Sequence, residues 1–264
     1  MSLAASFEIE YLQYLKPDGT LSGPLPPAVA DAAALLPLFK RMLFVRTFDT
    51  KAIALQRTGK LGTYAACLGH EATHVGIGAS MRSEDVFAPS YREYGAQFER
   101  GVRPREVLLY WGGDERGNDF AGPRGDYPWC VPISTQCLMA SGAALSFKLR
   151  GENRVAVATC GDGGSSKTDF YAAVNSAGAF TLPLVLCVIN NGWAISVPRK
   201  AQTGADTLAQ KGLAGGLHCL QVDGNDLVAV LEAMRRAHER ARKGEGGSVI
   251  EFLTYRLHDH TTAD

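Results

Sequence analysis

The sequence predicts an α/β fold, a doubly wound parallel sheet with helices on both faces. Continuous apolar runs of about six residues recur in the second half of the chain, as in strands that are buried on both faces of a sheet. Segments with apolar residues at helical spacing lie between these runs. This alternation is typical of parallel strands joined by helical crossovers. Ligands of such sheets bind at the carboxyl ends of the strands, so we look for function in the loops there.

The second half of the chain contains the clearest elements. VAVATC and LVLCVI are the most continuous apolar runs, and each is followed by a loop of unusual sequence. The predicted strands are 155–160, 184–189, 217–224 and 248–255, and the predicted helices are 169–180 and 226–243.

The first half is predicted to begin with an arm and to continue in helices. Residues 1–27 are rich in Pro and Gly and lack periodicity, which is typical of turns. We therefore divide the chain into an N-terminal arm, 1–27, and one domain, 28–264. The expected elements are helices over 28–60 and 70–81, a short strand at 85–89, a helix after Ser90 and a long loop over 111–132. A loop of that length in a compact domain is more often functional than accidental.

Composition excludes several classes of partner. Lys plus Arg and Asp plus Glu are both 27, so the formal net charge is zero and no basic footprint for nucleic acid is present. No apolar run reaches the roughly 20 residues of a membrane span, and the N-terminus lacks the pattern of a secretory signal. The cysteines are scattered without a CxxC motif, which predicts buried free thiols in a cytoplasmic protein. They are Cys67, Cys130, Cys137, Cys160, Cys187 and Cys219.

The first unusual loop follows the strand at 155–160 and reads Gly161-Asp162-Gly163-Gly164. Glycines allow the backbone to bend and approach a ligand closely, and amides at the start of a helix suit a diphosphate. Asp162 would repel a phosphate unless a divalent metal lay between them. Mg²⁺ takes carboxylate and phosphate oxygens together. Taken alone, the loop is also compatible with a Gly-rich turn in which the aspartate caps a helix.

The second unusual loop begins with Asn190-Asn191, at the end of the next strand. An amide oxygen is a suitable second ligand for a hard cation, and backbone carbonyls supply further ones. The two loops are separated by one helix and one strand, so both are expected at the same edge of the sheet. The alternative is a pair of unrelated turns.

The segments around these loops resemble a known family. GDGGSSKTDFYAAVNSAGAF, NNGWAISVP and SYREYG are similar to the alpha subunit of thiamine-diphosphate-dependent 2-oxo acid dehydrogenases, which act on pyruvate or branched-chain 2-oxo acids. The similarity extends from LFVRTFDTKAIALQRTGKLG to TYRLHDHTTAD, nearly the whole chain. It implies a thiamine-diphosphate-binding fold, with thiamine diphosphate and Mg²⁺ as cofactors.

The resemblance also implies individual roles. Asp162 and Asn191 would bind Mg²⁺ through their side chains and Trp193 through its carbonyl. Glycines would line the diphosphate, Tyr91 and Arg92 would face it, and isoleucines would border the rings of the cofactor. The implied cofactor-binding residues are Tyr91, Arg92, Ile133, Gly161, Asp162, Gly163, Gly164, Asn191, Ile195 and His260. In some relatives a structural potassium ion, K⁺, lies at the positions of Pro132, Thr135 and Gln136.

His260 matches the active-site histidine of the family and is the predicted catalytic residue. A histidine with an unperturbed pKa near 6.5 exchanges protons around neutral pH, which suits stabilisation of an intermediate or acyl transfer. The alternative to a catalytic role is that His260 is an exposed loop histidine. Because the sequence ends inside the loop of the family, we expect residues 256–264 to be poorly held. We treat His70 and His74 as structural or surface residues.

The function that the resemblance implies is oxidative decarboxylation of pyruvate with acyl transfer to a lipoyl group. The implied partners are a beta subunit, in an α2β2 heterotetramer, and a lipoyl-bearing acyltransferase component. Alternatives are a branched-chain 2-oxo acid or acetoin dehydrogenase, or a silent scaffold, since Lys167-Thr168 replaces the Glu or Gln and Gly that are common in the family. A nicotinamide-dependent dehydrogenase would need GxGxxG after a strand, and no strand end carries it.

Overall fold

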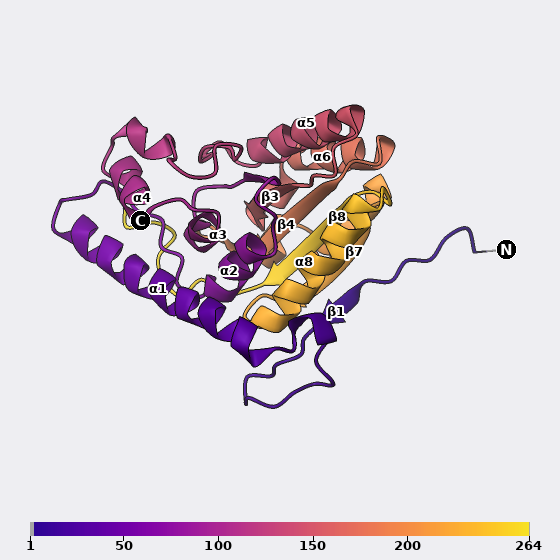
Figure 1. Cartoon of the computed structure of the whole chain (residues 1–264), viewed down its shortest axis with the longest axis horizontal. Helices are drawn as coiled ribbons and strands as arrows, with labels where there is room; N and C mark the ends of the chain where they lie inside the picture. Colours follow the sequence, from indigo (N-terminus) through magenta and orange to yellow (C-terminus); the bar gives the residue numbers. More distant parts are fainter. Residues whose placement is uncertain (1–2, 264) are drawn as a thin grey trace.

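The central element of the chain is a parallel sheet of six strands in the order β1-β7-β8-β4-β3-β2 (Figure 1). The structure is a computed structural model and describes residues 3–263. The strands are β1 (Glu10–Leu12), β2 (Val86–Ala88), β3 (Ala156–Gly161), β4 (Leu184–Asn190), β7 (His218–Asp223) and β8 (Ser248–Leu253). All the neighbouring strands of this sheet pair in parallel. A short antiparallel hairpin, β5 (Trp193–Ala194) and β6 (Val197–Pro198), follows β4.

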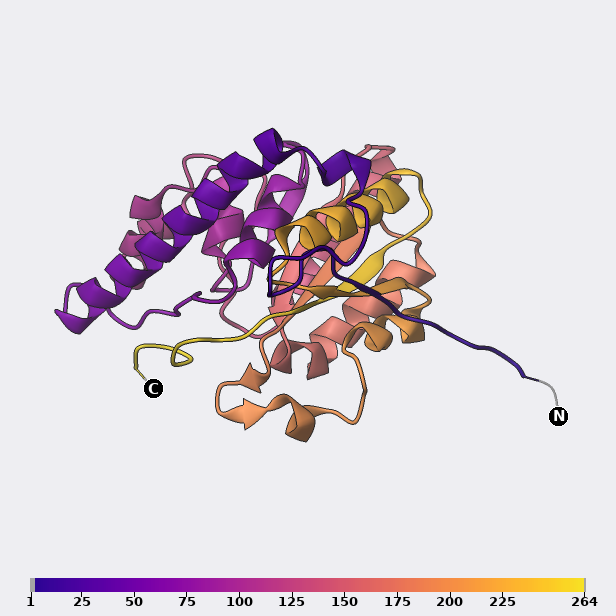
Figure 2. The same cartoon turned by 90° about the horizontal axis from the view of Figure 1, so that it is seen from below.

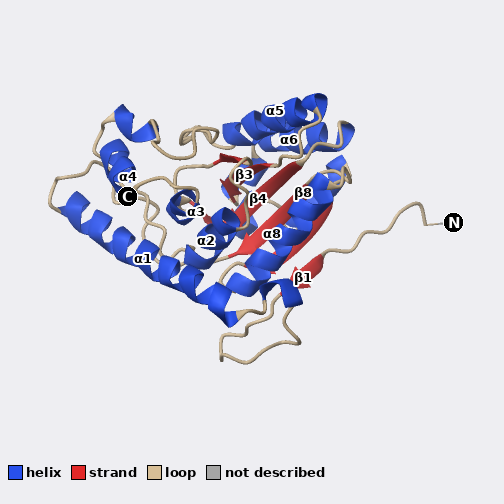
Figure 3. Cartoon of the chain, viewed as in Figure 1, coloured by secondary structure: helices blue, strands red, loops and turns tan. Residues whose placement is uncertain are grey.

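Helices cover both faces of the sheet (Figure 3), which confirms the doubly wound α/β prediction. The helices are α1 (Ala32–Arg57), α2 (Glu71–Ala79), α3 (Tyr94–Glu99), α4 (Pro104–Trp111), α5 (Thr135–Arg150), α6 (Thr168–Ala179), α7 (Arg199–Gln202) and α8 (Leu227–Arg242). Short 3-10 helices are η1 (Pro27–Val29), η2 (Glu115–Asn118), η3 (Gly163–Ser166) and η4 (Ala209–Gly215). None of the helices within residues 3–263 is long and apolar enough to cross a membrane.

The central strands are apolar on both sides because each side packs against a helical layer. Ala158 and Leu186 point into the cluster formed with α5, α6 and η4, whereas Val157 and Cys187 point into the cluster formed with α8 and α2. Burial of each large aliphatic side chain contributes about 1.5–3 kcal/mol. This two-sided burial explains why the strands are continuous apolar runs without alternation.

Sequence reasoning missed several elements. The arm is not separate from the sheet: β1 is its edge strand, and Tyr14 N and Leu15 N donate to Asp226 Oδ2 at 2.6 and 2.7 Å. The three residues of β1 are too few to show the alternation of apolar and polar side chains that indicates a strand. Helices α4 and α5 were also not predicted. In α5 the buried face consists largely of small or polar residues such as Ala140 and Ser141, which produce no apolar stripe. Residues 1–2 and 264 lie outside the described part.

All six cysteines are buried free thiols, as predicted.

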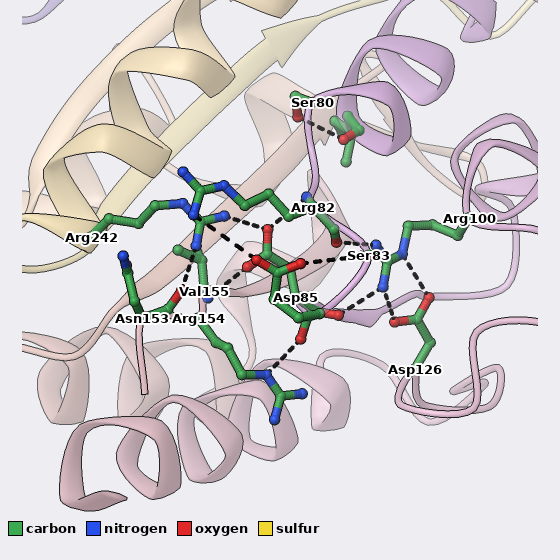
Figure 4. Close-up of polar contacts among 12 residues, drawn as sticks. Ser80, Arg82, Ser83, Asp85, Arg100, Asp126, Asn153, Arg154, Val155 and Arg242 are labelled. Atoms are coloured by element: carbon green, nitrogen blue, oxygen red, sulfur yellow. Dashed lines mark hydrogen bonds and ion pairs between the residues drawn. The ribbon is translucent and has the colours of Figure 1, made fainter. Parts of the chain in front are cut away.

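A buried ionic network fixes the amino ends of β2 and β3 (Figure 4). Asp85 accepts hydrogen bonds from Val155 N at 2.9 Å and from Arg242 at 2.5 Å. Arg100 donates to the Asp85 carbonyl at 2.7 Å. Two of its guanidinium nitrogens also donate to the Asp126 carboxylate, at 2.9 and 2.7 Å. The network therefore ties α8, α3 and the long loop after α4 to the sheet, at the end opposite to the carboxyl edge.

We expect Asp85→Asn to destabilise the chain by about 3 kcal/mol, because breaking a buried pair leaves Arg242 as an uncompensated buried charge. Urea unfolding measures the change. Asp119→Asn is the matched control: Asp119 pairs with Arg124 at the surface, with 74% and 69% of the two side chains exposed. It should cost less than about 1 kcal/mol. Equal losses in the two variants would contradict the role given to the buried network.

Burial also makes the fold sensitive to acid. It lowers the pKa of His238 on α8 to about 4, and neither ring nitrogen has a hydrogen-bond partner in the described structure. The unfolded chain then takes up this proton first as the pH falls from about 6.5 toward 4. Stability contributed by neutral His238 is present above pH 6.5 and is lost through that window.

His238→Leu should therefore flatten the pH dependence of the free energy of unfolding by up to about 1.4 kcal/mol per pH unit between pH 6.5 and 4. Denaturant unfolding of both proteins at half-unit intervals gives the two slopes. Parallel curves would show that His238 is not neutral in the folded chain.

Candidate active site

A cavity of about 680 Å³ lies at the carboxyl ends of β3 and β4. Its walls come from the loop after β3, the loop and hairpin after β4, the segment before α3, the start of α5 and the C-terminal segment. Every residue predicted to bind the cofactor or the metal lines it: Tyr91, Arg92, Ile133, Gly161, Asp162, Gly163, Gly164, Asn191, Trp193, Ile195 and His260. The fold thus brings all of these candidates together; their roles stay predictions.

Two glycines of the GDGG turn, Gly163 and Gly164, pack too tightly for a side chain. A Cβ on Gly163 would lie 2.5 Å from Ala194 Cβ, and one on Gly164 would lie 2.7 Å from Ser134 Oγ. Ser134 Oγ donates to the Gly164 carbonyl at 2.7 Å and so attaches the start of α5 to the turn. The glycines therefore serve close packing between three loops of the cavity as well as the bend after β3.

Asp162 is a buried carboxylate that faces the cavity. It is 2% exposed, and Gln202 Nε2 donates to Oδ2 at 3.3 Å, a long hydrogen bond. Burial raises the pKa of the Asp162 carboxyl, because desolvation disfavours the charged form. A divalent cation beside it would supply the missing compensation.

The two adjacent asparagines have different tasks. Asn190 is structural: its Nδ2 donates to Glu251 Oε1 at 2.7 Å and its Oδ1 accepts from Gly192 N at 3.1 Å. Asn191 lines the cavity. Its Oδ1 accepts from Trp193 N at 3.1 Å, and its Nδ2 lies 3.2 Å from His70 Nε2.

The donor set around Asp162 fits a magnesium ion. Asp162 offers a carboxylate and Asn191 an amide oxygen, and both are hard ligands. In the hairpin Trp193 stands opposite Pro198, which has no N–H to donate to the Trp193 carbonyl. Residues 3–263 contain no group of three His, Cys, Asp or Glu side chains able to hold a metal ion. A site with one carboxylate and few other protein oxygens is typical of Mg²⁺, which completes its shell with phosphate oxygens and water.

The opposite wall is formed by Arg92 and His260. Arg92 is 7% exposed and donates to the carbonyls of Ala66 and His260, the latter at 2.9 Å. The same guanidinium nitrogen lies 3.1 Å from His260 Nδ1. A guanidinium can only donate, so Nδ1 accepts and neutral His260 carries its proton on Nε2. That nitrogen lies 3.5 Å from Tyr91 Oη.

The C-terminal segment is held in place, contrary to our expectation. Leu257 N donates to Leu68 O at 3.3 Å and Thr262 N to Tyr64 O at 3.0 Å. Figure 2 shows this segment crossing from β8 toward α1. These backbone hydrogen bonds to the loop before α2 hold the segment in place. Asp264 lies outside the described residues.

Ile195 reaches the cavity through a strained turn. It has φ 56°, in the left-handed region, at the tip of the β5–β6 hairpin. This conformation costs a β-branched residue about 1–3 kcal/mol. Arg256 donates to the Ile195 carbonyl at 2.8 Å and so joins the hairpin to the C-terminal segment. Strain of this kind clusters at ligand sites.

The potassium positions are engaged within the chain. Thr135 Oγ1 donates to Asp169 at 2.9 Å, and Gln136 Nε2 donates to the Thr159 carbonyl at 2.6 Å. The Pro132 carbonyl accepts from Cys130 Sγ at 3.3 Å. The potassium site remains a prediction.

Sequence reasoning missed two residues that support the cavity from behind. Lys211 is 6% exposed, and its Nζ donates to Ser165 O at 3.0 Å and to Ser165 Oγ at 2.8 Å. Burial lowers the pKa of its amine. Glu251 Oε2 accepts from Leu208 N at 2.8 Å. A charged residue inside the apolar strand SVIEFL was the available signal for Glu251; nothing comparable marked Lys211.

Comparison with known proteins identifies the family of this chain. The family model of the dehydrogenase E1 component matches residues 39–264. A pyruvate dehydrogenase E1 component subunit alpha of Acholeplasma laidlawii is 42% identical over 230 residues, 87% of this chain and 67% of that protein. A 3-methyl-2-oxobutanoate dehydrogenase subunit alpha of Mycobacterium tuberculosis is 41% identical over 98% of this chain and 71% of that protein.

A pyruvate dehydrogenase E1 component subunit alpha of Staphylococcus epidermidis is 39% identical over 97% of this chain and 69% of that protein. The match to the family model covers most of the chain, and each of these relatives is matched over two thirds of its length or more. Together with the fold, they confirm the resemblance found in the sequence, and this chain belongs to the dehydrogenase E1 component family.

Proposed function

We propose that this chain is the alpha subunit of a thiamine-diphosphate-dependent 2-oxo acid dehydrogenase, with pyruvate as substrate. The observation that carries the proposal is the convergence of Asp162, Asn191 and Trp193 on one cavity that also contains Arg92 and His260. This set matches a diphosphate bound through Mg²⁺. When bound, thiamine diphosphate supplies the carbanion that attacks the 2-oxo carbon and the electron sink for decarboxylation.

The residues of this chain bind and orient. Asp162 and Asn191 hold the metal, which neutralises the repulsion between Asp162 and the diphosphate. Gly163 and Gly164 allow backbone to approach the phosphates. The apolar side chains of Ile133 and Ile195 exclude water from the reacting end of the cavity.

His260 is the proton carrier that the geometry favours. Arg92 fixes its ring through Nδ1, so the proton lies on Nε2, the nitrogen 3.5 Å from Tyr91 Oη. From there it can hydrogen-bond to an oxygen of the 2-oxo acid or of the departing acyl group. Arg92 itself remains charged and attracts anions.

A beta subunit is the proposed partner that closes the cavity. The apolar residues around it are open to solvent, with 49% of Val131, 57% of Ile195 and 44% of Val197 exposed. Such a rim is typical of a surface that a partner covers. We propose an α2β2 heterotetramer that transfers its acyl group to the lipoyl-bearing acyltransferase component.

Branched-chain 2-oxo acids are the alternative substrates, favoured by the relative from Mycobacterium tuberculosis. Acetoin is a third candidate on the sequence alone. A silent scaffold is the alternative without activity, and Lys167 is the residue that would explain it. Lys167 is exposed and lines the cavity, where its charge also suits a diphosphate.

The test is decarboxylation by the full chain assembled with its beta subunit, with Mg²⁺, thiamine diphosphate and an artificial electron acceptor. Pyruvate and 3-methyl-2-oxobutanoate are compared. We expect turnover that is faster with pyruvate and that disappears in Asp162→Ala, because the metal loses its carboxylate ligand. A complex that binds cofactor but turns over neither substrate would favour the silent scaffold; one that binds no cofactor would refute the proposal.

Lys211→Met should weaken thiamine diphosphate binding about tenfold, because the diphosphate turn loses charged hydrogen bonds worth about 1.5–3 kcal/mol. Quenching of tryptophan fluorescence in the assembled complex measures the affinity. Lys200→Met, an exposed lysine of α7, is the matched control and should bind like the wild type. Equal affinity in all three proteins would show that Lys211 has no part in holding the turn.

A further inference from the structure

His70 lies directly behind the metal-facing amide of Asn191. It is the residue before α2, is fully buried, and lies on the wall of the cavity. Its ring spans two polar groups: Nδ1 is 3.2 Å from the Cys67 carbonyl and Nε2 is 3.2 Å from Asn191 Nδ2. The sequence offered no reason to connect this histidine with the metal site.

The hydrogen atoms of this chain of contacts can be assigned from chemistry alone. A carbonyl oxygen can only accept, so the Cys67 carbonyl requires the proton on His70 Nδ1. In the neutral ring Nε2 is then an acceptor, and it requires a donor from Asn191. That donor is the NH₂ group of the amide.

An independent contact on the other side of the amide gives the same assignment. Trp193 N donates at 3.1 Å to the remaining atom of the Asn191 amide, and a backbone N–H can only donate. That atom is therefore the oxygen. The carbonyl oxygen of Asn191 retains a second lone pair for a cation.

The orientation matters because an amide is nearly symmetric in shape but not in charge. If the amide were rotated by half a turn, its NH₂ group would face the cation and one metal ligand would be lost. His70 penalises this rotation, since two lone pairs, on Nε2 and on the amide oxygen, would then face each other. The same rotation would set the NH₂ group against the Trp193 N–H, so the two contacts hold the amide together.

We propose that His70 is a positioning residue for the metal site: it holds the Asn191 amide with its oxygen toward Mg²⁺. The inference rests on the proposed function, in which Asn191 is a metal ligand. Residues that orient metal ligands in this way typically contribute 10–100-fold in metal affinity.

The chain offers a matched control, His74. It is also fully buried, lies one turn further along α2, and stacks on His70 with ring centroids 5.5 Å apart and planes at 14°. Neither of its ring nitrogens has a hydrogen-bond partner in the described structure. His74 also lines the cavity, so the same substitution at the two positions compares two buried cavity-wall histidines of which only His70 contacts Asn191.

The experiment compares His70→Phe, His70→Gln and His74→Phe in the complex with the beta subunit. Mn²⁺ is the probe at saturating thiamine diphosphate, and electron paramagnetic resonance counts the free ion, so the readout does not need activity. His70→Phe keeps the stack but removes the acceptor and should raise the Mn²⁺ dissociation constant by roughly 10–100-fold. His70→Gln places an amide oxygen near the position of Nε2 and should restore most of the affinity.

His74→Phe should bind Mn²⁺ like the wild type. Wild-type affinity in His70→Phe would overturn the inference, as would an equal loss in His74→Phe. If His70→Phe does not fold, His70→Leu, which has no acceptor atom, takes its place with the same expected loss. A wild-type complex that binds no Mn²⁺ would instead overturn the proposed function itself.

Discussion

The parallel pairing of β3 with β4 is the constraint on which the site depends. Their register places Gly161 opposite Ile189, so the turn that carries Asp162 and the turn that carries Asn191 leave the sheet side by side. Neither residue needs a long loop to reach the other. The two helical layers fix this spacing, because a slip by one residue would move every side chain into the opposite layer, where the packing fits different side chains.

Two buried ionic groups hold these turns against the sheet. Glu251, on β8 beside β4, binds Asn190 and the backbone at the start of η4, and Lys211 of η4 binds the turn after Asp162. The same short 3-10 helix therefore connects both turns. Each turn contains backbone carbonyls or amides that cannot pair with a strand. A buried charged side chain can form hydrogen bonds with several of these groups at once.

The sequence predicted the sheet, its central strands and the loops that carry Asp162 and Asn191, because two-sided burial and glycine turns are local patterns. The other predicted residues of the cavity came from the resemblance to the family. It failed where an element depends on distant partners. The three residues of β1 become a strand only beside β7. The buried face of α5 consists mostly of small side chains, which pack closely but form no apolar stripe in the sequence. We interpreted His70 as a structural or surface residue because the role proposed for it depends on Asn191, far along the chain, and no spacing rule joins them.

The one carboxylate predicted to bind the metal is buried and, among the described residues, forms no ion pair; Gln202 donates a hydrogen bond to it. Arg92 and Lys167 line the cavity together with Asp162 and Glu93, so groups that attract a diphosphate and a 2-oxo acid lie beside carboxylates. Burial raises the pKa of the Asp162 carboxyl, so the folded chain holds an unfavourable group until a cation arrives. Binding of the proposed Mg²⁺ would remove this penalty, and ligand that binds only the folded state adds to its stability. In the proposed site, cofactor binding and stability would thereby be coupled through one carboxylate, and the neutral His70–Asn191 pair beside it would supply a metal ligand without adding a second charge.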